Sequence, residues 1–546
     1  MKVFLLHPDR DFWIKPGLED PVFRAMLERG GNPYAIEDAR RTLERERAKN
    51  PAAAPPSFAS DQALTQDLEL TTLWRAMAAG DEFLFETARR GLLSSTTSTT
   101  EILYRQQVLA DCLAQPEVVR QIYALALEGL DAEREAGSLW NGAQPDRILR
   151  RSVKALKLHV DILKRLRLIA DEQAEAFRSP GFTRFFAMLR EELSDDYLAT
   201  VEGHLTELEL KHGVLETARL GKGLKGRSYV VRRQRELTWR ERLTHSRRTS
   251  GYTFELHPRD EAGFRALEAI RGHGINGVAN AAAQSSEHVK SFFTMLRLEL
   301  AFYLGCLNLH ERLVAKGEPV CFPEPLAAEE VALAAEGLYD VSLAQHLDER
   351  VVGNDVDAEA KDLLVITGAN QGGKSTFLRS MGLAQLMMQA GMFVGAASFK
   401  ANVCAGVFTH YKREEDETME SGKLDEELRR MSAIARQLIP NAMLLCNESF
   451  ASTNEREGSE IARQIVRALL AKRIKVAFVT HMYDLAHGFY EQQLETALFL
   501  RAERQEDGAR TFRLHEAPPL PTSYGEDSYR RIFSDRISHD AAVAGG

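Results

Sequence analysis

The sequence predicts an all-α region followed by an α/β domain with a mostly parallel sheet. Helical periodicity dominates residues 61–316, where apolar side chains recur every three or four positions. From about residue 362 onward, short apolar runs alternate with helical segments, a pattern typical of parallel strands joined by helices. A strongly basic stretch at residues 219–248 interrupts the helical region, which predicts an inserted segment there.

The overall composition excludes several classes of protein. The chain has 546 residues, which suggests about three to four domains, and a net charge of −9, which excludes a uniformly basic coat for nucleic acid. Its five cysteines are widely spaced and include no C-x-x-C pair, as expected for buried thiols in a reducing compartment. Because the sequence has neither a signal-peptide pattern nor an apolar run of about 18 residues, we expect a cytoplasmic protein without a membrane partner.

We divide the chain into four parts. Residues 1–60 are expected to form a small N-terminal segment that ends in a linker rich in Pro and Ala. Residues 61–340 are expected to form the helical region, with the insert at about residues 205–280. Residues 341–510 would then form the α/β domain, and residues 511–546 a strand, a helix and a tail associated with it.

Two long helices are predicted within the helical region. Apolar residues in the first helix follow a heptad spacing, and the second helix is expected from about Glu287 to Leu313. Since the basic stretch lies between them, the two helices could pack as the legs of an extended antiparallel arm. The heptad positions of the first helix are Leu149, Val153, Leu156, Val160 and Leu163.

The basic stretch suits contacts with nucleic acid. It contains 11 Lys or Arg residues and two acidic residues, so it carries +9 and the rest of the chain −18. Aromatic residues such as Tyr229 and Trp239 lie among the basic ones, a combination that suits phosphate contacts and base stacking. The alternatives are a charged surface loop or a docking site for the protein's own acidic regions. The candidate nucleic-acid contacts are Lys222, Lys225, Arg227, Arg232, Arg233, Arg235 and Arg240.

A phosphate-binding motif follows the first apolar strand of the α/β domain. Residues 368–375 match G-x-x-x-x-G-K-[ST], directly after the strand at residues 363–367 and before a helical pattern. Backbone N–H groups of such a loop surround phosphate oxygens, while Lys374 would reach the β- and γ-phosphates and Ser375 would ligate Mg²⁺. The candidate nucleotide contacts are Gly368, Ala369, Asn370, Gln371, Gly372, Gly373, Lys374, Ser375 and Thr376.

Polar residues also follow two later apolar strands. Asn447 and Glu448 come directly after residues 442–446, and His481 follows residues 476–480. Asn447 stands where a P-loop ATPase usually carries an Asp that holds the shell of the magnesium ion. The amide of Asn447 could hydrogen-bond a metal-bound water but adds no charge. Glu448 stands where a general base would orient the attacking water. The alternative for Asn447 is that it marks a weakened or inactive hydrolytic site. The alternative for His481 is a purely structural role.

Four segments resemble the ATPase domain of the MutS family of DNA mismatch repair proteins. Residues 368–394 resemble the family's nucleotide loop and following helix, and NESFASTNEREG at 447–458 occupies the register of its DEIGRGTSTYDG segment. VTHMYDL at 479–485 and PTSYGEDSYRRIF at 521–533 resemble two further family elements. The resemblance covers roughly residues 345–535 well.

The resemblance implies an ABC-like P-loop ATPase that uses ATP and Mg²⁺. It implies that Glu448 is the catalytic carboxylate, with Lys374 and His481 in the same site. Two subunits of this group sandwich ATP, so a homodimer is expected, with Ser421 and Gly422 as signature-segment contacts in trans. The basic insert falls where the family's DNA clamp lies, which implies binding of duplex or branched DNA without sequence specificity.

The sequence also departs from the family pattern. About 60 residues precede the helical region, which are too few for the family's N-terminal mismatch-recognition domain. Asn447 replaces the usual Asp, and Gln371 replaces the usual Met. We therefore expect a short MutS-like, ATP-dependent DNA-binding protein in repair or recombination. The main alternative is a weakly hydrolysing, nucleotide-dependent dimeric scaffold for a protein partner, and the third is mismatch recognition through an unfamiliar surface.

Overall fold

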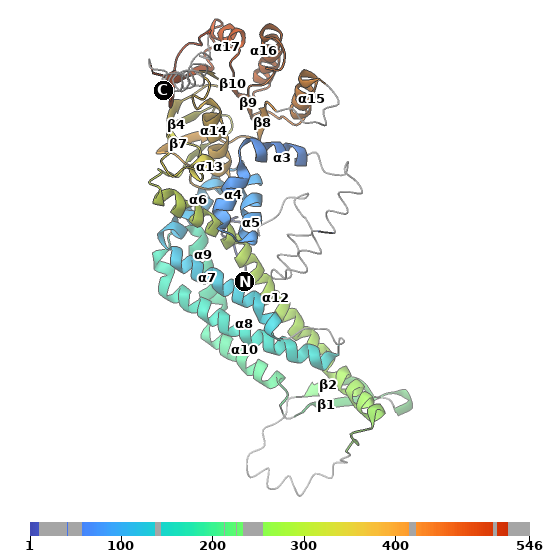
Figure 1. The fold of residues 1–546 in the computed structure, drawn as a ribbon. Helices are drawn as coiled ribbons and strands as arrows, with labels where there is room; N and C mark the ends of the chain where they lie inside the picture. The colour runs from blue at the N-terminus through green and yellow to red at the C-terminus, as the bar shows by residue number, and fades with distance from the viewer. Residues whose placement is uncertain are drawn as a thin grey trace, which may run out of the picture. The chain divides into compact units, whose positions relative to one another are not determined.

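The computed structural model describes most of the chain as two compact units (Figure 1). The first unit comprises Met1–Val3, Glu117–Phe177 and Phe182–Leu298, and the second comprises Phe4–Pro116, Arg178–Gly181 and Glu299–Gly546. The residues that the structure describes are 1–9, 41, 57–94, 96–136, 144–211, 213–224, 226–232, 255–413, 422–505 and 510–521.

The first unit is built from long helices. It contains α7 (Pro116–Ala136), α8 (Pro145–Gln173), α9 (Pro180–Glu192), α10 (Asp195–Leu208) and the first part of α12 (Glu261–Ala315). All five predicted heptad residues of α8 are buried, as an amphipathic core helix requires. The second long helix was predicted to begin near residue 287 and begins 26 residues earlier, so the end of the predicted insert belongs to α12.

A short β-hairpin contains the described residues of the basic stretch, 219–224 and 226–232. Strands β1 (Leu215–Leu220) and β2 (Gly226–Arg232) pair antiparallel, with an irregularity between Thr217 and Arg219. One stretch of α12 has the length and hydropathy of a membrane span. However, 83% of that stretch is buried inside the molecule, which is typical of a core helix in a globular protein.

The second unit contains two sheets and the helices around them. Its N-terminal helices are α3 (Ser57–Asp67), α4 (Leu70–Ala78), α5 (Glu82–Leu93) and α6 (Thr99–Ala114). The smaller sheet has the strand order β3-β7-β4-β5. Its strands are β3 (Glu324–Leu326), β4 (Leu333–Leu338), β5 (Asn354–Asp357) and β7 (Ser398–Asn402), and the short helix α13 (Val341–Ala344) follows β4.

The larger sheet has the strand order β12-β11-β6-β10-β9-β8. Five of its strands are parallel, as the sequence predicts, and the edge strand β12 is antiparallel. The carboxyl ends of the parallel strands therefore lie at one edge. The strands are β6 (Leu363–Gly368), β8 (Val407–Tyr411), β9 (Met443–Asn447), β10 (Lys475–Val479), β11 (Ala497–Arg504) and β12 (Arg510–Glu516).

Helices cover both faces of this sheet because its strands are apolar on both faces. Alternate residues of β6, β9 and β10 pack against α15 (Lys423–Ala435), α16 (Glu455–Ala471) and α17 (Tyr483–Tyr490) in one buried cluster. The helix α14 (Lys374–Gln389) lies on the other face, where Gly382 comes so close to Leu445 that a Cβ would sit 2.7 Å from it.

Gly129 sets the packing of α7 against α12 in the first unit. A Cβ at this position would lie 2.5 Å from the ring of Phe293, and the carbonyl oxygen of Gly129 lies 2.9 Å from Nε2 of the buried His159. We predict that Gly129→Ala lowers the free energy of unfolding by about 1–2 kcal/mol. The overpacked ring outweighs the better helix propensity of Ala. Urea denaturation of the purified variant measures this.

Gly203→Ala on α10 is the matched control. No atom lies within 4 Å of a Cβ built there, so the same substitution should be neutral or slightly stabilising. Equal stability of the two variants would show that the contact between Gly129 and Phe293 does not limit packing.

Candidate functional site

The β6–α14 loop (residues 368–375) adopts a backbone that glycine makes possible. Gly368 and Gly373 have φ of 106° and 88°, values that other residues rarely adopt. Space excludes side chains too, since a Cβ on Gly368 would lie 2.8 Å from the backbone nitrogen of Ala502. A Gly-rich loop between a parallel strand and a helix is the arrangement with which P-loop domains surround phosphate groups.

The side chain of Lys374, the residue at which α14 begins, is buried. Its Nζ donates hydrogen bonds to the carbonyl oxygens of Gly368, at 2.9 Å, and Ala369, at 3.0 Å. Burial lowers the pKa of its ammonium group, while the charge of Glu448 opposes that change. A phosphate bound in the loop would bring further negative charge to this cation and so favour its protonated form.

Two side chains that could hold a magnesium ion lie in contact. The Oγ atom of Ser375, in the first turn of α14, donates to Oδ1 of Asn447, at the end of β9, over 2.9 Å. Both are oxygen ligands of the kind that Mg²⁺ accepts, and substrate phosphates and water normally complete its shell. Among the described residues, no group of three His, Cys, Asp or Glu side chains is placed to hold a metal ion.

Glu448 and His481 form a pair at the same sheet edge. One carboxylate oxygen of Glu448 lies 2.5 Å from Nδ1 of His481 and accepts from its backbone N–H at 3.2 Å. The hydrogen bond with Glu448 raises the pKa of the His481 imidazole, against the effect of partial burial. The backbone of Glu448 has φ of 54°, and its N–H donates to the carbonyl of Val479.

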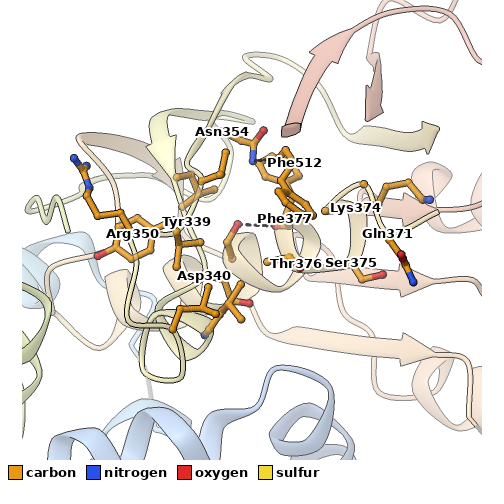
Figure 2. A pocket seen from close by; sticks show the side chains of 18 of the residues that line it. Tyr339, Asp340, Arg350, Asn354, Gln371, Lys374, Ser375, Thr376, Phe377 and Phe512 are labelled. Atoms are coloured by element: carbon orange, nitrogen blue, oxygen red, sulfur yellow. Dashed lines mark hydrogen bonds between the residues drawn. The ribbon is translucent and has the colours of Figure 1, made fainter. Parts of the chain in front are cut away.

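A cavity of about 660 Å³ adjoins these residues (Figure 2). Residues 370–377 of the loop and α14 form one wall, and residues from 338–354 form the other. Glu448 and Phe512 also line it. The volume suits a nucleotide-sized ligand. The wall at 338–354 was not anticipated from the sequence because its residues match no motif.

Asn354 and Phe512 were missed by sequence reasoning as well. Nδ2 of Asn354 donates to the carbonyl oxygen of Phe512 at 3.1 Å, and its Oδ1 accepts from the backbone N–H of Leu514 at 2.6 Å. These two bonds fasten β12 to β5 beside the loop, where Phe512 stays half-exposed at the cavity. The position of β12 depends on its antiparallel pairing with β11, which no local pattern predicts.

The structure describes only part of the other predicted sites. Lys222, Arg227 and Arg232 are exposed on the hairpin of the first unit, where Nε of Arg232 donates to Thr217. Gly422 is the N-cap residue of α15, with no atom within 4 Å of a Cβ built on it. Lys225, Arg233, Arg235, Arg240 and Ser421 lie outside the described residues.

The chain matches two protein-family models and several known proteins. The models are the MutS2 N-terminal domain, over residues 97–316, and MutS domain V, over residues 364–528. The DNA mismatch repair protein MutS of Chloroflexus aurantiacus is 29% identical over 207 residues, which are 37% of this chain and 21% of that protein. MutS of Thermus aquaticus is 31% identical over 179 residues, 32% of this chain and 21% of the relative. MutS protein homolog 4 of Mus musculus is 29% identical over 140 residues, which are 26% of this chain and 15% of that protein.

This chain belongs to the MutS family. The second matched range contains the β6–α14 loop, Glu448 and His481, so the sequence similarity and the geometry of the site concern the same residues. The matches span only 15 to 21% of the length of these three relatives.

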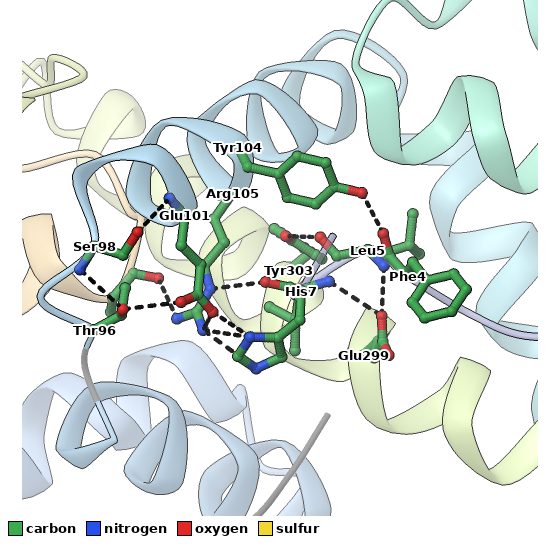
Figure 3. Close-up of polar contacts among 12 residues, drawn as sticks. Phe4, Leu5, His7, Thr96, Ser98, Glu101, Tyr104, Arg105, Glu299 and Tyr303 are labelled. Atoms are coloured by element: carbon green, nitrogen blue, oxygen red, sulfur yellow. Dashed lines mark hydrogen bonds and ion pairs between the residues drawn. The ribbon is translucent and has the colours of Figure 1, made fainter. Parts of the chain in front are cut away.

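A second polar cluster in the same unit anchors the N-terminus and is separate from the cavity (Figure 3). The carboxylate of Glu299 accepts from the backbone N–H groups of Leu5, at 2.6 Å, and Leu6, at 3.1 Å. The hydroxyl of Tyr303 donates to the carbonyl of Leu5, and Nε of Arg105 donates to that of Leu6. These contacts satisfy buried backbone groups, so the cluster serves the fold.

We predict that Glu448→Gln lowers the pKa of His481. The wild-type imidazole should titrate above its ordinary value because the carboxylate stabilises the imidazolium. The pair therefore stabilises the fold below about pH 6.5, and this stabilisation is lost as pH rises through the raised pKa. An NMR titration of the His481 ring measures both midpoints, and identical midpoints would show that the two side chains do not interact in solution.

Proposed function

We propose that this protein binds ATP with Mg²⁺ at the β6–α14 loop and hydrolyses it, as a DNA-binding ATPase in repair or recombination. The observation that carries the proposal is the convergence of three strand ends. The loop after β6, the Asn447–Glu448 pair after β9 and His481 after β10 meet beside a nucleotide-sized cavity. Phosphoryl transfer needs these parts together, since it depends on positioning and charge.

Each residue has a definite task in this proposal. Backbone N–H groups of the loop and the ammonium group of Lys374 would hold the phosphates. Ser375 and Asn447 would hold Mg²⁺, which when bound neutralises charge on the phosphate oxygens. Glu448 would accept a proton from the attacking water. His481 would keep that carboxylate in place and carry positive charge toward the terminal phosphate.

Hydrolysis is proposed to be slow because of Asn447. An amide oxygen accepts hydrogen bonds but brings no negative charge to the metal, whereas a carboxylate in this position does. The same residue motivates the second candidate function, a dimeric scaffold that binds ATP, barely hydrolyses it and engages an acidic partner protein through the basic hairpin.

Assembly and DNA binding are further parts of the proposal. The family resemblance favours a homodimer in which Gly422, the N-cap residue of α15, faces the nucleotide of the other subunit. The wide spacing of the cysteines favours a cytoplasmic location. The exposed basic residues of the hairpin would contact the backbone of duplex or branched DNA. Phosphate contacts give affinity without reading the base sequence.

We predict that Glu448→Gln lowers ATP turnover by about 100-fold or more, because the amide accepts no proton from water. Steady-state phosphate release with Mg²⁺ measures this. Glu172→Gln, on the exposed surface of α8, is the matched control and should keep wild-type turnover. Wild-type turnover in Glu448→Gln would contradict the assigned role, and no turnover in the wild type would favour the scaffold.

A charge-removal variant tests the DNA-binding part. Replacing Lys222, Arg227 and Arg232 by Ala should weaken binding to duplex DNA. It should also reduce the slope of log K against log salt by about 3, since each phosphate contact releases about one counterion. Fluorescence anisotropy at several salt concentrations measures this slope.

The control for DNA binding replaces three exposed basic residues of the second unit. Their loss should leave the slope unchanged, and an equal effect of both variants would show that only net charge matters. The control residues are Arg436, Arg467 and Lys472.

A further inference from the structure

The turn that carries Glu448 has an unusual backbone. Glu448 and Phe450 both have positive φ, 54° and 64°, although neither is glycine. Residues with side chains seldom adopt this conformation, and it persists only where the surrounding structure imposes it. The turn follows β9 directly, so whatever holds it also fixes the direction of the Glu448 carboxylate.

His410 holds this turn from the neighbouring strand. It lies on β8, is completely buried, and pairs in register with Cys446 of β9. Its Nδ1 atom lies 2.7 Å from Oγ of Ser449, and its ring stacks on that of Phe450, with centroids 5.4 Å apart and an angle of 22°. Thus His410 contacts both residues that follow Glu448.

The hydrogen bonds of His410 define one arrangement of protons. Its Nε2 atom lies 3.1 Å from the backbone carbonyl oxygen of Glu427, which can only accept, so Nε2 carries the hydrogen. In a neutral ring Nδ1 is then an acceptor, and the hydroxyl of Ser449 donates to it. The carbonyl oxygen of His410, 2.6 Å from the same hydroxyl, is a second acceptor for that hydrogen.

Burial, together with nearby positive charges, keeps the ring of His410 neutral. Burial, followed by the charges of Arg430 and Arg413, lowers the pKa of His410 to about 4. Arg430 on α15 donates to the carbonyl of Tyr411, and Arg413 pairs with Asp67 at 2.8 Å. The carboxylate of Glu427 is buried on α15 and accepts from the hydroxyl of Ser452.

We propose that His410 and Ser449 are positioning residues for ATP hydrolysis, because they hold the turn at residues 448–450 and thereby aim the Glu448 carboxylate. The inference rests on the proposed function, since hydrolysis is the reaction that Glu448 would serve. Neither residue lines the cavity, so both act through the turn and not on the nucleotide. Their loss should therefore change kcat and leave the binding of ATP unchanged.

Three variants test this proposal. His410→Phe keeps an aromatic ring against Phe450 but loses both hydrogen bonds, and Ser449→Ala removes one of them. Each should lower kcat for ATP by about tenfold, with KM within twofold of wild type, because misplacement of a reacting group costs rate more than binding. His410→Asn keeps an acceptor near the position of Nδ1 and should recover most of the lost kcat.

Two controls separate positioning from a general loss of structure. His310 is a partly buried histidine outside the site, and its ring centroid lies 5.3 Å from that of Phe393. His310→Phe should therefore leave kcat unchanged. Adding His410→Phe to Glu448→Gln should not lower the residual turnover further, because the aimed carboxylate is already absent. Thermal unfolding of each variant identifies any that do not fold, and Ser449→Ala then carries the test.

The outcomes distinguish this inference from the proposed function. If wild-type turnover does not depend on Glu448, the proposed function fails. If turnover depends on Glu448 but folded His410→Phe and Ser449→Ala keep kcat within twofold of wild type, the inference is overturned. An equal loss of turnover on the wild-type and Glu448→Gln backgrounds would also overturn it, since the effect would not pass through Glu448.

Discussion

The parallel pairing of β6, β10 and β9 is the constraint on which the site depends. Val479 at the end of β10 lies in register with Ile366 of β6 on one side and with Asn447 of β9 on the other. Three segments far apart in the sequence therefore end at one edge, where Lys374, Glu448 and His481 come together. A shift of one residue in either pairing would turn the strand-end side chains to the opposite face.

The site combines a rigid frame with unusual electrostatics. Apolar residues on both faces of the sheet fix the strands, while two glycines and the left-handed turn after β9 shape the backbone at the proposed nucleotide site. Lys374 is held by neutral carbonyl oxygens. Asn447 is also neutral, whereas P-loop ATPases usually have a carboxylate at this position. In the function proposed above, the nucleotide itself would supply much of the negative charge in this site, and this would favour binding over rapid hydrolysis.

Local patterns predicted the fold where the signal was strong. The heptad of α8, the strands β6, β9 and β10, and the loop before α14 could all be predicted because period and motif are local properties of the chain. Other features depend on contacts between distant segments, which no local pattern encodes. They are the anchoring of residues 4–7, the cavity wall at 338–354, and the contact of Asn354 with β12. The start of α12 was misplaced because residues 261–286 lack a continuous apolar stripe, and the role of His410 emerged only from its buried contacts.

The most direct test of this account is the equilibrium affinity of the purified protein for ATP with Mg²⁺. Isothermal titration should show binding by the wild type, binding of similar strength by Glu448→Gln, and a loss of at least about tenfold for Lys374→Ala, which removes a charge-assisted phosphate contact. Equal affinity of Lys374→Ala and the wild type, or no binding by either, would contradict the claim that the β6–α14 loop holds a nucleotide.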